Sequence, residues 1–130
     1  MVAMSEPGEI VLTGTWLSSY TYPSSSQGGT YSSQDQVIVS QDADKVTVRS
    51  VPDSPNEITM TLSLTGTILT GTWAERTDPD GPYEGYRYWG VVQFLASPDG
   101  RVLTGRWLGH SRNGDVINDG VWELVRAAEG

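Results

Sequence analysis

A few polar side chains in this sequence have the types and surroundings that chemistry on a small organic molecule needs. Glu75 lies two positions after Trp73, so alternation along a strand places both on one face. A carboxylate among aromatic rings has its charged form disfavoured, which suits an acid or a base. A tyrosine hydroxyl or a side-chain amide can polarise a carbonyl as charge develops on it. We therefore take four residues as candidate catalytic groups: Tyr20, Glu75, Tyr88 and Gln93.

Two polar residues have a second interpretation. Glu75 is also open to a role as a rim carboxylate paired with Arg76 or Arg87. His110 is the one histidine, and strict alternation from Trp107 points it outward. A bulge at the end of its strand would turn it inward instead, as a ligand-binding residue. The sequence leaves both alternatives open.

The composition excludes several kinds of site. The chain has no cysteine, which removes disulfides, thiolate metal sites and thiol catalysis. A single histidine makes a transition-metal site improbable, and no glycine motif that cradles phosphate occurs. The segment TDPDGPY at 77–83 lacks the further ligands of a calcium loop and indicates a turn. We expect neither a metal nor another cofactor.

The charge and the absence of apolar runs limit the partners. Sixteen acidic residues against eight basic ones give a net charge of −8. Binding to nucleic acid or to an anionic membrane depends on Lys and Arg, so we expect neither. The opening MVAMSEPGEI has no basic start followed by an apolar run, and no apolar stretch approaches the ~18 residues of a membrane span. The sequence predicts a cytoplasmic protein, either a monomer or a homodimer.

The candidate residues must be positioned by strands, because strict alternation of apolar and polar residues is the dominant pattern. From Ile58 to Leu64 every second residue is apolar, and hydroxyls stand between them. Eight such runs lie at about 11–22, 35–41, 45–51, 57–65, 68–76, 84–96, 101–110 and 117–126. We predict an all-β, eight-stranded antiparallel up-and-down barrel at 11–127, with tails at 1–10 and 128–130.

The connections between the predicted strands alternate in length. Those after the second, fourth and sixth strands are tight, and those after the odd-numbered strands are longer and rich in turn formers. In an up-and-down barrel the two sets lie at opposite ends. One end is therefore pinched shut, and ligands reach the interior through the other.

A repeated motif places indole rings inside this barrel. LTGTW at 12–16 returns at 69–73 and again as LTGRW at 103–107. We take the Trp face as interior, because an indole buries ~150–250 Å² and three outward rings would make an unusually apolar surface. These rings serve as core and closure of the barrel, and one or two of them also touch a ligand.

The other inward positions define a candidate binding set. The sixth strand presents either the face of Tyr86, Tyr88 and Phe94 or the face of Arg87, Trp89 and Gln93, and we favour the first because the second would bury Arg87. The candidate substrate-binding residues are Tyr22, Met60, Leu62, Trp73, Tyr86, Phe94, Trp107, His110 and Trp122.

Both ends of the chain carry a familiar pattern. Gly14, Thr15 and Trp16 open the first predicted strand, and Arg126 ends the last. This arrangement resembles the lipocalin and calycin pattern, in which an N-terminal Gly-x-Trp packs under a basic residue of the final strand at the closed end. The resemblance implies a cation–π contact between Trp16 and Arg126, worth ~0.5–2 kcal/mol.

Longer stretches carry broader likenesses. Nearly the whole chain, through GTWLSSYTYPSSSQGG, LTGTWAERTDPDGPYEGYRYWG and GRWLGHSRNGDVINDGVWEL, resembles a barrel domain often found behind helix-turn-helix domains in actinomycete regulators. In architecture it is similar to stand-alone barrels that act as cyclases in actinomycete polyketide pathways, including those forming spirotetronates by intramolecular cycloaddition. No catalytic residue carries over from those enzymes. The repeated LTGTW is also similar to avidins, without a matching set of biotin contacts.

Three functions fit these features. The favoured one is an enzyme, of the Diels–Alderase type, that folds a hydrophobic, polyketide-like intermediate inside the barrel for intramolecular cyclisation. The second is a carrier, resistance protein or sensor that binds a hydrophobic molecule without changing it. The third is a filled barrel in which the aromatic residues are simply core. In the first two, the expected partner is a hydrophobic small molecule.

Overall fold

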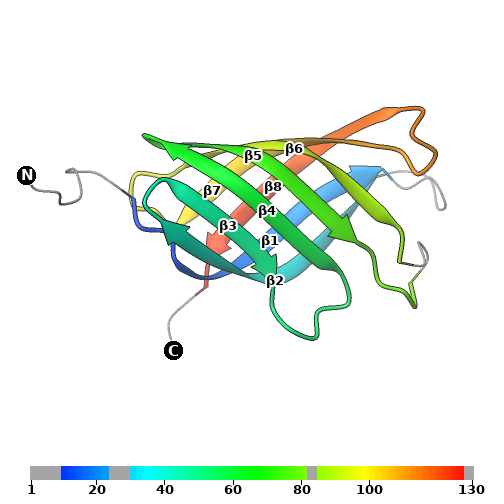
Figure 1. Ribbon diagram of the computed structural model, residues 1–130, viewed down its shortest axis with the longest axis horizontal. Coiled ribbons are helices and arrows are strands. Elements are labelled where there is room, and N and C mark those ends of the chain that lie inside the picture. The colour runs from blue at the N-terminus through cyan, green and yellow to red at the C-terminus, as the bar shows by residue number, and fades with distance from the viewer. Residues whose placement is uncertain (1–9, 24–29, 82–84, 128–130) are drawn as a thin grey trace, which may run out of the picture.

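The chain forms a closed barrel of eight antiparallel strands. The computed structural model describes residues 10–23, 30–81 and 85–127. The strands are β1 (Gly14–Pro23), β2 (Thr30–Asp42), β3 (Lys45–Ser50), β4 (Glu57–Thr65), β5 (Ile68–Arg76), β6 (Arg87–Ala96), β7 (Val102–His110) and β8 (Ile117–Arg126). Each pairs with the next, and β8 pairs with β1, so the predicted up-and-down barrel is confirmed (Figure 1). In these residues no helix is long and apolar enough to cross a membrane.

Some strand limits differ from the sequence prediction. β2 begins at Thr30 rather than near 35, because the added residues pair with the end of β1 as far as Pro23. The rings of Tyr22 and Tyr31 lie 6.3 Å apart across this added pairing, and aromatic and Thr side chains favour strands. β6 begins at Arg87 rather than 84, since Gly85 has a positive φ of 73° in the preceding turn.

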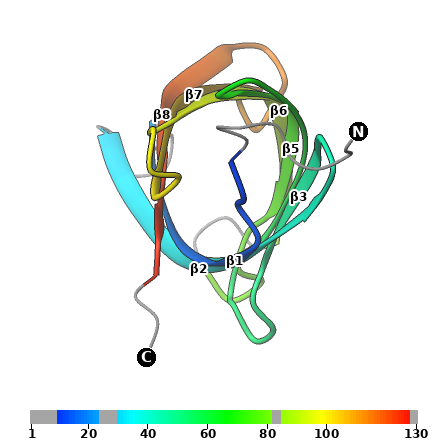
Figure 2. The ribbon, with the colours of Figure 1, turned by 90° about the vertical axis from the view of Figure 1, so that its left-hand side faces the viewer.

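Residues 10–13 form a plug that closes one end of the barrel, and they do not extend β1. In Figure 2 this segment crosses the barrel end that faces the viewer. Ile10 and Leu12 are buried in the core, although the prediction assigned Ile10 to the N-terminal tail. The Gln41 side chain holds the segment, accepting from the Leu12 N–H at 2.7 Å and donating to the Ile10 carbonyl at 3.1 Å. The predicted tails at 1–9 and 128–130 lie outside the described residues.

Arg126 joins both chain ends at this closed base. Its guanidinium lies over the ring of Trp16, 4.6 Å from the centroid, which is the contact implied by the lipocalin pattern. It also donates to the carbonyls of Val11 at 2.6 Å and Thr13 at 3.1 Å. Trp16 is fully buried, so one cation holds the last strand, the first strand and the plug together.

The glycines of the second and third motif copies permit close strand contact. A methyl group at Gly71 would collide with the carbonyl oxygen of Thr61 on β4. A methyl at Gly105 would collide in the same way with the carbonyl oxygen of Gln93 on β6. These glycines are therefore required by the approach of neighbouring backbones and do not leave space for a ligand.

We predict that Arg126→Met destabilises the barrel by roughly 2–3 kcal/mol, because it removes the cation–π contact and hydrogen bonds to two carbonyls. The measurement is the free energy of unfolding from urea denaturation. Arg106→Met is the matched control, since Arg106 is 69% exposed and its approach to Asp119 is 4.0 Å; its effect should stay below about 0.5 kcal/mol. Equal losses in the two variants would contradict the role given to Arg126.

Candidate ligand-binding cavity

A cavity of about 500 Å³ opens at the end of the barrel opposite the plug. Its strand residues are Tyr20, Tyr22, Ser33, Trp73, Glu75, Tyr88, Trp107, His110, Asn118 and Trp122. Its loop residues are Pro55, Asn56, Thr77, Asp78, Gly81, Ser111, Arg112 and Val116, from the connections β3–β4, β5–β6 and β7–β8. The mouth therefore lies among the longer connections, as the alternation of loop lengths predicts.

Aromatic rings form the inner wall and floor of the cavity. Trp73 meets Trp107 edge to face with centroids 5.4 Å apart, and it meets Trp122 in the same way at 5.7 Å. Tyr20 packs on Trp122 at 4.8 Å. Phe94, fully buried, contacts the far side of Trp122 at 6.4 Å. The lumen is thus packed toward the base and hollow toward the mouth.

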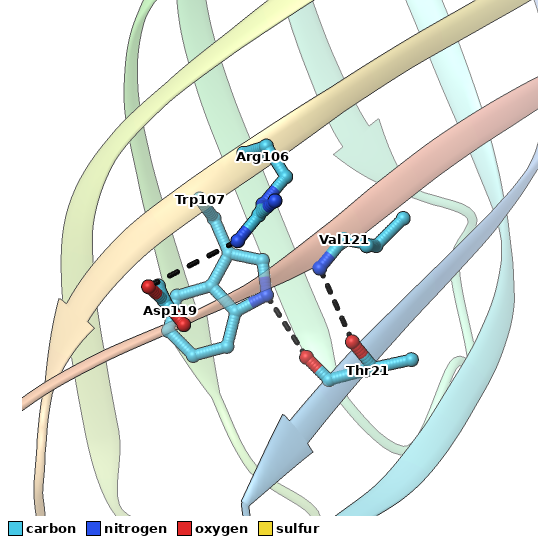
Figure 3. A network of polar contacts seen from close by, with 5 residues as sticks. All are labelled: Thr21, Arg106, Trp107, Asp119 and Val121. Atoms are coloured by element: carbon cyan, nitrogen blue, oxygen red, sulfur yellow. Dashed lines mark hydrogen bonds and ion pairs between the residues drawn. The ribbon is translucent and has the colours of Figure 1, made fainter.

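The indole N–H groups of this wall are bonded within the protein. They donate from Trp73 to the Leu108 carbonyl (3.1 Å), from Trp107 to the Thr21 carbonyl (3.0 Å) and from Trp122 to the Ser18 hydroxyl (2.8 Å). Figure 3 shows that Thr21 also accepts the Val121 N–H through its hydroxyl, at 3.1 Å. Because these bonds occupy the N–H groups and fix the rings, the indoles offer a ligand their carbon atoms and not their N–H groups.

Tyr20 and Glu75 form a polar pair in the cavity wall. The Tyr20 hydroxyl donates to Glu75 Oε2 at 2.5 Å, from β1 to β5. Burial raises the pKa of Glu75 to about 7, although the bond from Tyr20 lowers it in part. Burial and the neighbouring Glu75 charge raise the pKa of Tyr20 far above its usual range. Tyr20 therefore stays a hydrogen-bond donor, while Glu75 changes charge near neutral pH. The partner of Glu75 is thus Tyr20, and not Arg76 or Arg87 as in the alternative prediction.

Sequence reasoning missed two members of this polar group, Ser33 and Asp35 on β2. Ser33 lines the cavity, and its hydroxyl favours the ionised form of Tyr20. Burial raises the pKa of Asp35, and its Oδ2 atom is buried without a hydrogen-bond partner among the described residues. The signal was present, because stepping back by twos from Val37 reaches both positions on the inward face.

Eight of the predicted site residues come together in the cavity wall: Tyr20, Tyr22, Trp73, Glu75, Tyr88, Trp107, His110 and Trp122. The favoured face of β6 points inward, with Phe94 buried and Tyr88 half-buried. Gln93 was wrongly placed at the site. It lies on the opposite face of β6, exposed, and donates to the Thr70 hydroxyl at 3.0 Å. Two residues of opposite parity on one strand cannot both face the lumen.

Other predicted binding residues lie outside the cavity lining. Met60, Leu62 and Phe94 are buried in the packed core, where they support the wall without reaching the open space. Tyr86 lies half-buried before β6, where its hydroxyl donates to the Arg112 carbonyl. The Arg112 guanidinium lies 5.2 Å from the centre of the same ring, so Tyr86 holds the β7–β8 loop at the mouth.

His110 lines the mouth of the cavity, but its ring is engaged at both nitrogens. Nδ1 lies 2.9 Å from the Ser111 carbonyl, and Nε2 accepts the Trp89 N–H at 3.3 Å. The neutral imidazole with its proton on Nδ1 satisfies both contacts. These contacts hold the His110 ring at the end of β7, beside the mouth of the cavity. Across the described segments, no group of three or more metal-ligating side chains is found.

A closed eight-stranded antiparallel barrel with a Trp–Arg contact at its sealed base and a cavity at its mouth is a calycin-like barrel. A crystal structure of a mutant of the vaccine antigen transferrin binding protein B from Haemophilus parasuis has the same kind of fold. It matches with a TM-score of 0.55 at 12% identity, over 93% of this chain and 28% of that one. At this identity the likeness shows the fold alone.

The sequence comparisons match less of the chain than the structural comparison does. No protein-family profile matches the chain. The proto-oncogene tyrosine-protein kinase ROS of Gallus gallus is 35% identical over 66 residues, which is 51% of this chain and 3% of the kinase. This chain thus spans a small part of that protein, as it does of transferrin binding protein B.

We predict that the buried Glu75 makes stability depend on pH. Its pKa is about 7 in the barrel against an ordinary 4.5, so the folded protein holds a proton that the unfolded chain releases between these values. The free energy of unfolding therefore falls as pH rises through this window. Glu75→Gln should remove this contribution of Glu75 to the pH dependence. Between about pH 5 and pH 8, the free energy of unfolding of the variant should rise by about 2–3 kcal/mol relative to that of the wild type.

Urea denaturation at a series of pH values measures this difference. Glu57→Gln, a change of an exposed carboxylate on β4, is the control and should leave the pH dependence as in the wild type. Parallel curves for Glu75→Gln and wild type would show that Glu75 ionises normally.

Proposed function

We propose that the protein binds a hydrophobic small molecule inside the barrel and catalyses its intramolecular cyclisation. The reaction class is a Diels–Alder-type cycloaddition of a polyketide-like natural-product intermediate. The observation that carries the proposal is the cavity of about 500 Å³, walled by fixed aromatic rings and holding one ionisable pair. Such a volume and such a wall suit an organic molecule of drug size.

The cavity supplies what a pericyclic ring closure requires. This reaction needs no nucleophile and transfers no proton, so the protein contributes chiefly by bringing two ends of one molecule together. Holding them at near-attack distance supplies ~7–11 kcal/mol. The rings of Trp73, Trp107 and Trp122 suit this task, because their N–H bonds to the protein prevent the wall from repacking around an extended substrate.

The polar residues of the wall have distinct parts in this proposal. Tyr20 directs its hydroxyl hydrogen at Glu75, so this pair anchors a polar end of the substrate. Tyr88 lies opposite Glu75 in the β5–β6 register and lines the same cavity. We assign to its hydroxyl the donation of a hydrogen bond to a substrate carbonyl conjugated with the reacting alkene. Charge develops on that carbonyl in the transition state.

A second function, binding without reaction, is favoured by a different observation. The Tyr20 hydroxyl donates to Glu75 within the protein, so neither residue requires a reacting group as its partner. A carrier or sensor of hydrophobic molecules would use the same cavity. The two functions differ in whether the bound molecule leaves chemically changed.

We predict that incubation with a linear polyketide precursor gives a cyclised isomer of unchanged mass, identified by mass spectrometry and NMR. Tyr88→Phe should lower the turnover number about ten- to a hundredfold through the lost hydrogen bond, with an unfolding free energy within about 1 kcal/mol of wild type. Tyr31→Phe, at an exposed ring on β2, is the matched control and should change neither value.

Two results would change these assignments. Tight binding with recovery of only the starting precursor would favour the carrier or sensor function. A Tyr88→Phe variant that loses stability and turnover to the same extent would remove Tyr88 from the reaction and leave it a structural role.

A further inference from the structure

Two acidic residues belong to the polar group around Tyr20, and one of them, Glu75, lines the cavity. Glu75 on β5 and Asp35 on β2 both belong to the group around Tyr20, and Asp35 Oδ2 is buried with no hydrogen-bond partner among the described residues. The described lining includes one Arg and no Lys. That Arg112 lies at the mouth, where its guanidinium packs on the ring of Tyr86. His110 also lies at the mouth, where its ring packs on that of Tyr88 at 5.6 Å. Among the described residues, no Lys or Arg lies beside Glu75 to balance its charge.

The aromatic wall has the same electrostatic preference. The N–H groups of Trp73, Trp107 and Trp122 are used by the protein, and the three indole rings line the cavity. Aromatic faces attract organic cations, most strongly where water is excluded. A carboxyl group beside three indoles is therefore a binding environment for positive charge on an apolar molecule.

We propose that the ligand of this cavity carries a positively charged nitrogen, as a protonated amine or a quaternary ammonium, seated between Glu75 and the indole faces. The rest of the molecule is apolar and fills the space toward the mouth. This inference rests on the proposed binding function and names its ligand class. Anionic amphiphiles such as fatty acids are disfavoured by the inner carboxyl groups, and the net charge of −8 repels them at long range.

Binding of a cation is linked to the ionisation of Glu75. The groups that face Glu75 are Tyr20 from β1, Asp35 from β2 and Tyr88 from β6, while β4 places the uncharged Ile58 beside it. Each of these elements lacks a cation at that position, so a bound ammonium becomes the counter-ion of Glu75. The ammonium stabilises the carboxylate and lowers the pKa of Glu75 below about 7.

The sign of the pH dependence follows from this linkage. Below about pH 7 a cation must displace the proton of Glu75 before the full attraction is realised, so its affinity is reduced. Affinity therefore rises with pH by up to about tenfold per unit and levels off above pH 7. Asp35, whose pKa is also raised by burial, acts in the same direction. A quaternary ammonium isolates the effect, since its own charge does not titrate.

We predict that three probes with one aryl chain separate the ligand classes. They are phenylpropyl-trimethylammonium, phenylpropanol and phenylpropionate, each titrated into the full chain by calorimetry. The cation should bind about tenfold more tightly than the alcohol at about pH 8, and the anion should bind most weakly. The affinity for the cation should fall as the pH is lowered from about 8 to 6, while that for the alcohol stays constant.

The matched variants are Glu75→Gln at the proposed seat and Glu123→Gln at an exposed position of β8. Glu75→Gln should lower affinity for the cation at least fivefold, keep affinity for the alcohol within about twofold and leave only the smaller pH dependence that Asp35 contributes. Glu123→Gln should leave all three unchanged. The pH series on the unmodified protein tests the same claim without any substitution.

The outcomes distinguish this inference from the proposed function on which it rests. If the alcohol binds as tightly as the cation at every pH, the cationic ligand is excluded and the hydrophobic cavity remains. If the anion binds most tightly, the inference is overturned and the inner carboxyl groups do not set ligand charge. If all three probes fail to bind, the proposed binding function is overturned together with the inference.

Discussion

The pairing of β1 with β8 is the interaction on which the rest of the structure depends. Trp16 lies opposite Arg126 in this seam, and Tyr20 lies opposite Trp122. The first pair builds the sealed base, and the second contributes to the cavity wall. Closure also removes the two free edges that an eight-stranded sheet would otherwise expose. A single seam between the chain ends thus gives the barrel both its stability and its hollow end.

One repeated motif supports two different tasks in this barrel. The Trp of the first copy lies at the base under Arg126, whereas the Trp residues of the second and third copies form the cavity floor. The tilt of the strands carries equivalent residues to different heights along the axis. The glycine two positions before each of the latter two lets adjacent backbones approach closely at the same level. The repeated motif therefore gives the barrel closely packed walls. The cavity itself is bordered by the residues nearer the mouth.

Alternation along the strands was sufficient to predict the barrel, its sealed and open ends and most inward positions. The face of β6 was less certain because both faces carry aromatic rings, and the buried Phe94 and exposed Gln93 decide it. The bond between Tyr20 and Glu75 could not be predicted, since it joins side chains 55 positions apart across the lumen. Strand periodicity predicts which face of the sheet a residue lies on. It does not predict which residue on the opposite side of the lumen contacts it. Asp35 was not among the predicted site residues, although it lies two positions before Val37 on the same face of the strand.

In the part of the chain that the structure describes, the segment 10–13 closes one end of the barrel and the cavity opens at the other. Whatever occupies the lumen has to leave by the route it used to arrive, and water displaced on the way in takes that route as well. Under the proposed function, a bound molecule is therefore released through the same opening that admits the next one, and the described loops at that opening take part in both steps.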